Sequence, residues 1–378
     1  PELNLRAQSQ GFNWEELESA LNKSHCKGTK VYFCLNIFPT QEQIPRIKEY
    51  LQELKHYALD GIIVADPGIV ALTAQIVPEL PIHLSTQANT TNSASANFWK
   101  DLGVQRVNLS RELNLRQIRR IRESVPDMEL ESFVHGAMCM ALSGRCFLSS
   151  YLNRRSANQG WCTHPCRYDY RVVSLGLEER KRPGQITWEL IEQGNYTDIL
   201  ASEDLCLIKY LGWFIKNSIT ALKIEGRMKT SSYLAQVVDV YKTAIRDISQ
   251  NRFRPGLYFS ELRHTAGRAL GTGFFLPTGN KTILETSANK MHTPVLAKLL
   301  YPEDETTWII SVRHRFEQDF NFQILLPGLQ RPLINAGEYA LENQEGQSVD
   351  TLHSGLQGRL RLIHPHLEPG LLLRKIQG

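Results

Sequence analysis

The stretch "GIIVADPGIVALTAQIVPELPIHLSTQANTTNSASANFWKDLGVQRVNLSRE" covers residues 61–112 and contains three short apolar runs, separated by segments with helical character. Three more runs of this kind occur outside it, at residues 30–36, 129–136 and 221–227. A strand that alternates with a helix every ~20–30 residues is typical of parallel βα units. The sequence therefore predicts an α/β fold with a parallel sheet.

We expect this sheet to form a (β/α)8 TIM-like barrel, although six runs are two short of eight strands. The chain begins with Pro1 rather than Met, and we expect the missing N-terminal strands to precede it. An open, doubly wound sheet remains the alternative. The predicted domains are the barrel at 1–252 with a cysteine-rich insertion at 136–200, a Gly-rich connector without helical period at 253–290, and a small C-terminal β-barrel at 291–378.

The composition narrows the class of protein. Of 378 residues, 42% are hydrophobic and 22% charged, and the formal net charge is +4. No apolar run approaches the ~18–20 residues of a membrane span, so we expect no membrane association and a cytoplasmic location. The modest positive charge permits a nucleic-acid partner without requiring one.

Each apolar run ends in residues that can bind or react. In a barrel of this type the carboxyl ends of the strands form the face that carries the active site. Polar residues also simply end strands and begin helices, which is the alternative explanation. The strand-end residues are Asn36, Asp66, Gln87, Ser110, Arg111, Glu112, His135, Glu225 and Arg227.

Four of the seven cysteines lie within 28 residues, in the pattern C-x6-C-x15-C-x3-C formed by Cys139, Cys146, Cys162 and Cys166. Cys206 follows downstream. Structural zinc sites usually have paired C-x2-4-C knuckles, whereas iron–sulfur clusters accept irregular spacing. The spacing favours an iron–sulfur cluster and leaves zinc, or buried or disulfide-forming thiols, as alternatives.

The block "ELESFVHGAMCMALSGRCFLSSYLNRRSANQGWCTHPCRYDY" at residues 129–170 closely resembles the signature of the collagenase-like peptidase family of unassigned catalytic type. "STQAN", "NLSREL", "SEDLC" and "KIEGRMK" match further family blocks in the same order. The chain looks most similar to the prephenate-dependent tRNA uridine hydroxylase subgroup, which makes 5-hydroxyuridine at the wobble position. Two departures are Leu270 and Gly271, where the family usually has Tyr and Thr, and Asp319, where a turn glycine is common.

The resemblance implies a [4Fe–4S] cluster whose metal ligands are Cys139, Cys146, Cys162 and Cys166, with Cys206 as the alternative fourth ligand. It also implies prephenate as co-substrate. Prephenate carries two carboxylates, which Arg and Lys bind well. We assign Arg111, Lys223 and Arg227 to these carboxylates, and Glu112, His135 and Glu225 to proton handling or hydrogen bonding of the base. An ion-pair network of Lys223, Glu225 and Arg227 is the structural alternative.

The implied partner is tRNA, and a paralogous partner subunit is a further expectation. "RQIRRIR" at 116–122 forms a dense basic helix face, and basic and aromatic residues recur in the C-terminal domain. The alternatives are a hydroxylase acting on rRNA or a ubiquinone precursor, a collagenase-like peptidase using Cys139 near His135, and a non-enzymatic RNA-binding module. Neither H-E-x-x-H nor G-x-S-x-G occurs, which argues against known protease chemistry.

Overall fold

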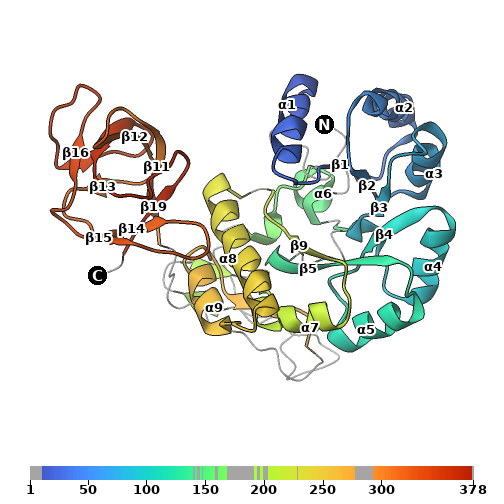
Figure 1. Cartoon of the computed structure of the whole chain (residues 1–378). Helices are drawn as coiled ribbons and strands as arrows, with labels where there is room; N and C mark the ends of the chain where they lie inside the picture. Colours follow the sequence, from blue (N-terminus) through green and yellow to red (C-terminus); the bar gives the residue numbers. More distant parts are fainter. Residues whose placement is uncertain are drawn as a thin grey trace. The chain divides into compact units, whose positions relative to one another are not determined.

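The computed structural model describes residues 11–138, 141–142, 145–146, 148–157, 161–167, 191–193, 196–198, 203–227, 229–276 and 293–376. By its internal contacts the chain forms two compact units (Figure 1). The first comprises Pro1–Leu207, Trp213–Met228 and Ala269–Ala288. The second comprises Ile208–Gly212, Lys229–Arg268 and Asn289–Gly378.

The first unit is built on a parallel sheet, and all six predicted strands are confirmed in it. Neighbouring strands pair in the order β1-β2-β3-β4-β5-β9. Their bounds are β1 (Tyr32–Leu35), β2 (Gly61–Val64), β3 (Ile82–Leu84), β4 (Val104–Asn108), β5 (Glu129–Ala137) and β9 (Ala221–Ile224). No pairing joins β9 to β1 within the described residues, so the parallel sheet is observed and its closure into an eight-stranded barrel stays a prediction.

Two short strands extend this sheet, one that follows the cysteine-rich insertion and one from the connector. β8 (Asp204–Cys206) pairs antiparallel with the end of β5, and β10 (Leu270–Gly271) pairs parallel with β8. β6 (Ile191–Gln193) and β7 (Tyr196–Asp198) form a separate antiparallel pair.

Helices follow most of the strands, as the alternating pattern predicts. Figure 1 shows α2 to α5 along the outer side of the sheet. The helices of this unit are α1 (Trp14–His25), α2 (Ile44–Glu53), α3 (Pro67–Ile76), α4 (Ser93–Asp101), α5 (Leu115–Ser124), α6 (Leu148–Asn153) and α7 (Leu211–Lys216). Asp66 is the N-cap of α3, where its carboxylate accepts from the Ile69 N–H at 3.1 Å. For Asp66, therefore, the helix-starting explanation is sufficient.

The two faces of the sheet differ in chemistry because successive side chains of a strand point to opposite faces. One face is fully buried and aliphatic, and the opposite face is polar. The aliphatic positions are Ile62, Val64, Leu84, Val107 and Leu130, each at most 1% exposed. The polar positions, linked by contacts given below, are Tyr32, His83, Arg106, Glu131 and Lys223.

The second unit joins two helices, α8 (Ser231–Ser249) and α9 (Pro255–Arg263), to a curled antiparallel sheet of seven strands. The strand order is β15-β14-β19-β11-β12-β18-β16, and β13 pairs with β17. Their bounds are β11 (Val295–Pro302), β12 (Thr307–Val312), β13 (Phe316–Glu317), β14 (Phe322–Leu325), β15 (Leu333–Ile334), β16 (Ala340–Glu342), β17 (Thr351–Leu352), β18 (Gln357–Arg361) and β19 (Leu372–Lys375).

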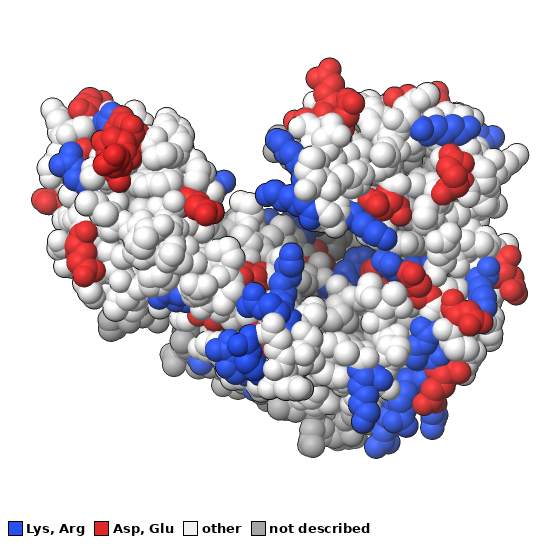
Figure 2. Space-filling model, in the orientation of Figure 1, with Lys and Arg blue, Asp and Glu red and all other residues white. Residues whose placement is uncertain are grey.

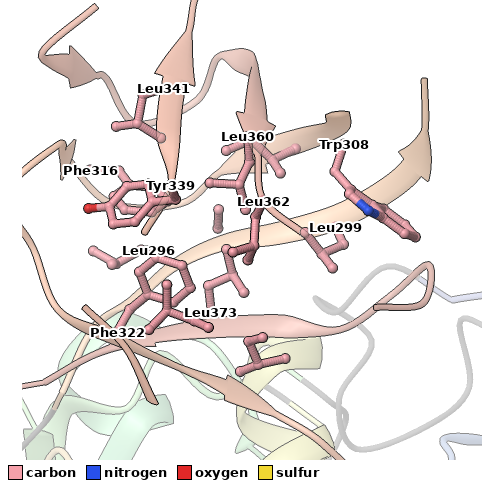
Figure 3. Close-up of a cluster of buried hydrophobic side chains, with 14 of the residues drawn as sticks. Leu296, Leu299, Trp308, Phe316, Phe322, Tyr339, Leu341, Leu360, Leu362 and Leu373 are labelled. Carbon is pink, nitrogen blue, oxygen red and sulfur yellow. The ribbon is translucent and has the colours of Figure 1, made fainter. Parts of the chain in front are cut away.

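Figure 3 shows the core enclosed by this sheet, in which Phe316, Phe322 and Tyr339 meet with ring centroids 5.0–5.6 Å apart. Each of these aromatic rings alternates along its strand or loop with more exposed residues, the pattern of a half-buried sheet. The prediction of an all-β C-terminal region is confirmed.

The expectation that the connector lacks helical structure is wrong for α9. Pro255 occupies its first turn, where a missing N–H costs nothing, and Tyr258 and Leu262 bury one face at i and i+4. The short helix was overlooked because Gly256 and the flanking glycines dominate the local composition. α8 and α9 belong to the same compact unit as the C-terminal antiparallel sheet, and not to the unit of the parallel sheet.

No helix in the described part of the chain has the length and apolar character needed to span a bilayer.

Candidate functional site

Charged side chains from three adjacent strands meet on the polar face of the parallel sheet. Lys223 Nζ on β9 lies 2.7 Å from Glu131 Oε1 on β5. Arg106 on β4 approaches the same carboxylate, with Nη1 3.8 Å from Glu131 Oε2, and makes a closer pair with Glu129 at 2.6 Å. Glu131 thus lies between two cations, and its side chain is only 12% exposed. In Figure 2 the first unit is hollowed over this sheet, and basic and acidic side chains line the hollow.

His83 on β3 extends this layer and is electrically neutral there. It is buried, and its ring centroid lies 4.7 Å from that of Tyr32 on β1. Burial is the main cause that lowers the pKa of His83 to about 4, and the positive charge of Arg106 acts in the same direction. At neutral pH His83 can therefore hydrogen-bond but carries no charge.

Two of the three predicted carboxylate-binding cations converge on one aromatic ring. The Arg111 guanidinium carbon lies 3.6 Å from the centroid of Phe133, and Lys223 Nζ lies 5.7 Å from it. Arg111 follows β4, whereas Lys223 is on β9, so the tertiary structure brings together residues 112 positions apart. A ring face stabilises a guanidinium and holds it in a defined plane. Phe133 is therefore in contact with two of the cations that the sequence assigns to carboxylate binding.

Arg227, the third predicted cation, is exposed beyond the end of β9. Within the described residues Lys223 pairs with Glu131, on a different strand from Glu225 and Arg227. The suggested ion-pair network of Lys223, Glu225 and Arg227 is thus not the arrangement that holds Lys223.

The predicted acid–base residues lie at the carboxyl ends of β4, β5 and β9. Glu112 accepts a short hydrogen bond from the Ser110 hydroxyl, and both follow β4. His135 is 2% exposed on β5, and its carbonyl accepts from the Glu225 N–H at 2.9 Å. Gly136 has φ +107°, and a Cβ there would collide with the Glu225 backbone. Only glycine therefore allows the ends of β5 and β9 to approach so closely.

Three of the predicted cluster ligands belong to one small substructure. Cys146, Cys162 and Cys166 are half-buried, whereas Cys139 lies outside the described residues. The Cys162–Cys166 segment is fixed to α6 through Thr163. The Thr163 N–H donates to Ser149 Oγ at 3.1 Å, and the Asn153 amide donates to Thr163 Oγ1 at 2.8 Å. α6 begins two residues after Cys146, so these hydrogen bonds tie the Cys162–Cys166 segment to the helix that follows Cys146.

One hydrogen bond in this substructure suits a thiolate. The His164 N–H lies 3.4 Å from Cys162 Sγ, and His164 has φ +56°. Backbone N–H groups directed at sulfur stabilise thiolates and tune iron–sulfur clusters. Within the described ranges, no group of three or more His, Cys, Asp or Glu side chains is placed to hold a metal ion. Cys146, Cys162 and Cys166 are among the described residues, so the structure does not bring these three thiols into a metal-binding group, and Cys139 lies outside the described residues.

Cys206, the alternative fourth ligand, has different surroundings. It is fully buried within β8, and its backbone is in register with His135 of β5. The half-buried Cys166 lies instead in the same loop as Cys162, in the 3-10 turn Pro165–Arg167. Cys166 is thus part of the same segment as Cys162 and is accessible in part, whereas Cys206 is enclosed in a paired strand.

The cysteine-bearing segment is anchored at the carboxyl ends of the strands. Arg145 Nε donates to the Gln87 carbonyl, just past β3, at 3.0 Å. Its guanidinium also lies 5.0 Å from the centroid of Phe38, which follows β1. The segment beginning at Cys146 thus lies beside the end of the sheet that carries Glu112, His135 and Glu225.

The predicted basic face of α5 is only partly available to a partner. Arg116, Arg119 and Arg120 are exposed. Arg122 is half-buried, and it donates to the carbonyls of Met128, at 2.7 Å, and Val125. Arg122 therefore has a structural role and does not belong to the exposed basic face of α5. Beside α5, a groove of about 570 Å³ lies at the amino ends of β5 and β9, opposite the carboxyl ends of these strands.

Sequence reasoning limited to strand ends missed Tyr32, His83, Arg106 and Glu131. The signal was present as a polar residue inside each of several consecutive apolar runs, alternating with aliphatic ones. A parallel sheet buried on both faces would have aliphatic residues at these positions instead. The alternation therefore indicates that one face of the sheet is not packed against an aliphatic layer.

The sequence places this protein in a known family. The family model described as "Peptidase family U32" matches residues 1–284. The chain therefore belongs to peptidase family U32, in agreement with the resemblance found in the cysteine block.

The chain is also similar to proteins whose names describe the hydroxylation of RNA. The chain is 38% identical over 309 residues to "tRNA hydroxylation protein P" of Escherichia coli (strain K12), covering 72% of this chain and 68% of that one. It is 34% identical over 380 residues to "tRNA hydroxylation protein P1" of Bacillus subtilis (strain 168), covering 99% and 88%. The "23S rRNA 5-hydroxycytidine C2501 synthase" of Escherichia coli (strain K12) is 30% identical over 264 residues, covering 68% and 36%.

Proposed function

We propose that this protein is an iron–sulfur RNA-modifying enzyme that hydroxylates the wobble uridine of tRNA to 5-hydroxyuridine in a prephenate-dependent reaction. The observation that carries the proposal is the convergence of Arg111 and Lys223 on Phe133, at the end of the sheet where the cysteine segment is anchored. The names of the relatives support RNA hydroxylation as the reaction class.

Replacing the C5–H bond of uridine by C5–OH is a two-electron oxidation that also requires an oxygen donor. A cluster held by Cys139, Cys146, Cys162 and Cys166 would supply one-electron redox chemistry, which no ordinary side chain provides. The fit of the chain to such a cluster rests on three half-buried cysteines in one substructure and on the N–H directed at Cys162 Sγ.

The side chains around the sheet would bind and orient the small co-substrate. Arg111 and Lys223 would each take one carboxylate of prephenate, and the ion pair with Glu131 would hold Lys223 in place on the polar face. Glu112, His135 and Glu225 lie at adjacent strand ends, where they could hydrogen-bond the uracil edge or accept a proton. Arg227, being exposed, would contact RNA phosphate rather than prephenate.

A cytoplasmic location follows from tRNA as substrate, and a paralogous partner subunit remains part of the proposal. The peptidase alternative lacks support from the described geometry because His135 is buried within β5 and its predicted nucleophile, Cys139, is not among the described residues. A hydroxylase for rRNA or for a ubiquinone precursor would share the cluster and differ in substrate.

The test combines metal analysis with nucleoside analysis. Protein purified without oxygen should contain about four irons and four sulfides per chain and a visible absorption that bleaches on reduction. tRNA from a deletion strain should lack 5-hydroxyuridine, and the wild-type gene should restore it only in cells that make prephenate. Zinc or no metal in the protein, or unchanged tRNA with altered rRNA, would replace this proposal by one of the alternatives.

A further inference from the structure

Trp161 has an unusual environment for a tryptophan of this chain. Its side chain is 51% exposed, whereas Trp99 and Trp308 are 8% and 7% exposed. Trp14 and Trp213 are half-buried and stack on other aromatic rings. Single exposed apolar residues are common on proteins, so exposure alone assigns no role. The neighbours of Trp161 supply the additional evidence.

Two exposed arginines, Arg154 and Arg155, lie on the same substructure. Neither has a carboxylate partner among the described residues. Their backbones are ordered by α6, since the Arg154 N–H donates to Ser150 O at 3.0 Å and the Arg155 N–H to Ser149 O at 3.4 Å. Arg154 has φ +53°, a conformation that ends the helix and turns the chain outward.

The arginines and the tryptophan are held on one support. The Trp161 N–H donates to Ser156 O at 3.0 Å, which ties the indole-bearing residue to the residue after Arg155. Two positions further on, Thr163 is hydrogen-bonded to both Ser149 and Asn153 of α6. The backbones of Trp161, Arg154 and Arg155 are therefore held on segments that are hydrogen-bonded to α6 or to the residues that directly follow it.

An exposed aromatic ring beside exposed arginines is the chemistry that recognises single-stranded nucleic acid. Bases stack on the ring, and guanidinium groups neutralise the phosphates on either side. A purely structural role for the arginines, at the carboxyl end of α6, would explain their charge but not the neighbouring exposed indole.

We propose that Trp161, Arg154 and Arg155 form a contact site for an unpaired stretch of RNA, in which Trp161 stacks on a base and the two arginines contact phosphates. The inference rests on the proposed function and specifies where the RNA lies. Trp161 directly precedes Cys162, and the segment is anchored by Arg145 at the carboxyl ends of the strands. A loop nucleotide stacked here would lie next to the nucleotide that enters the site.

The test measures binding of a labelled anticodon stem-loop RNA to the intact protein by fluorescence anisotropy, without turnover. Trp161→Ala should weaken binding about ten-fold, the usual effect of removing one base–aromatic stack, and Trp161→Phe should retain most of the affinity. Arg154→Gln with Arg155→Gln should reduce the slope of log Kd against log salt by about 0.7 for each phosphate that the protein no longer neutralises.

Phe98→Ala is the matched control because Phe98 is 55% exposed on α4 of the same unit. It should bind RNA like the wild-type protein. Iron content is measured for every variant, so that a collapsed cysteine segment is recognised. If Trp161→Ala lowers the iron content, Trp161→Phe and the arginine double variant decide the question.

Wild-type affinity and an unchanged salt slope in the variants that keep their iron would overturn the contact site. That result would leave the proposed reaction intact, because hydroxylation is scored separately in cellular tRNA. Conversely, tight Trp161-dependent binding without 5-hydroxyuridine would retain the contact site and refute the reaction.

Discussion

Lys223 Nζ lies 2.7 Å from Glu131 Oε1, and this ion pair joins β9 to β5 on the polar face of the sheet. The two residues are 92 positions apart in the sequence. Glu131 is also approached by Arg106, so one carboxylate orders two cations. Lys223 Nζ also lies 5.7 Å from the centroid of Phe133, the ring that the Arg111 guanidinium contacts, so the ion pair helps to fix the position of Lys223 near that ring.

Glu131→Gln should destabilise the protein by about 1–3 kcal/mol, because two partly buried cations lose their shared counter-charge. Urea unfolding measures the effect. Lys100→Met is the matched control, since the Lys100–Asp127 pair is largely exposed and should contribute below about 1 kcal/mol. Equal effects of the two substitutions would show that the Glu131 ion pairs add nothing beyond a surface pair.

Arg111→Gln should raise the KM for prephenate at least about ten-fold while leaving the iron content unchanged, because the bidentate hydrogen bonds to one carboxylate can no longer form. Arg111→Lys should recover only part of the affinity, since an ammonium group cannot form the planar fork. Steady-state kinetics at saturating tRNA separate KM from kcat. An unchanged KM in Arg111→Gln would remove Arg111 from the co-substrate site.

The stability of the protein should fall in acid between about pH 6.5 and pH 4 because of His83. Its pKa is lowered to about 4 in the folded protein, from 6.5. In that window the unfolded chain binds a proton that the folded protein excludes, so protonation favours unfolding. The loss should reach about 3 kcal/mol, given about 1.36 kcal/mol per pKa unit. His83→Gln should flatten this part of the curve of unfolding free energy against pH, and an unaltered curve would contradict the assignment.

Cys162→Ala should abolish the visible absorption, the iron content and tRNA hydroxylation together. Cys206→Ala should keep the iron if Cys166 is the fourth ligand, because Cys206 is then only a buried residue of β8. The exposed Cys26 supplies the control, and Cys26→Ala should have no effect. Iron loss in Cys206→Ala together with iron retention in Cys166→Ala would reverse the assignment of the fourth ligand.

The second unit depends on an ion-pair network around Glu261 of α9. Burial acts to raise the pKa of Glu261, but hydrogen bonds and charge from Arg374 and Arg331 outweigh it and the net shift is downward. Arg374 is 2% exposed, and its Nη2 lies 3.0 Å from Glu261 Oε1. Arg374→Met should cost about 3–5 kcal/mol of unfolding free energy, because Glu261 is left buried and incompletely paired.

Calorimetry of Arg374→Met can be compared with Arg359→Gln in the same unit. The Arg359–Glu303 pair is more exposed, and its removal should cost about 1 kcal/mol or less. A transition temperature equally lowered in both variants would show that burial of the Glu261 network is not important for this unit.

Local pattern was enough to predict the parallel strands, most of the helices and the C-terminal β-structure. The spacing of apolar residues along the chain shows which residues can face a core, with a period of about two in strands and about 3.6 in helices. The runs at 61–66, 82–87 and 106–112 are clear examples of strands. The same reasoning failed at α9, where Pro255 and Gly256 mask a short amphipathic turn. At Asp66, one of the polar strand-end residues, the alternative explanation is sufficient, because its carboxylate caps α3.

The sequence alone determined the family, the order of the strands along the chain and the residue types available for chemistry. Only the tertiary structure decided which of these residues meet. Pairing between β5 and β9 brings both Glu131 and Phe133 close to Lys223, and Arg111 contacts the same Phe133 ring. Arg145 anchors the cysteine segment to Gln87. Such contacts join residues tens of positions apart, and no local pattern encodes them, because they depend on strand register and on how the insertion folds back over the sheet.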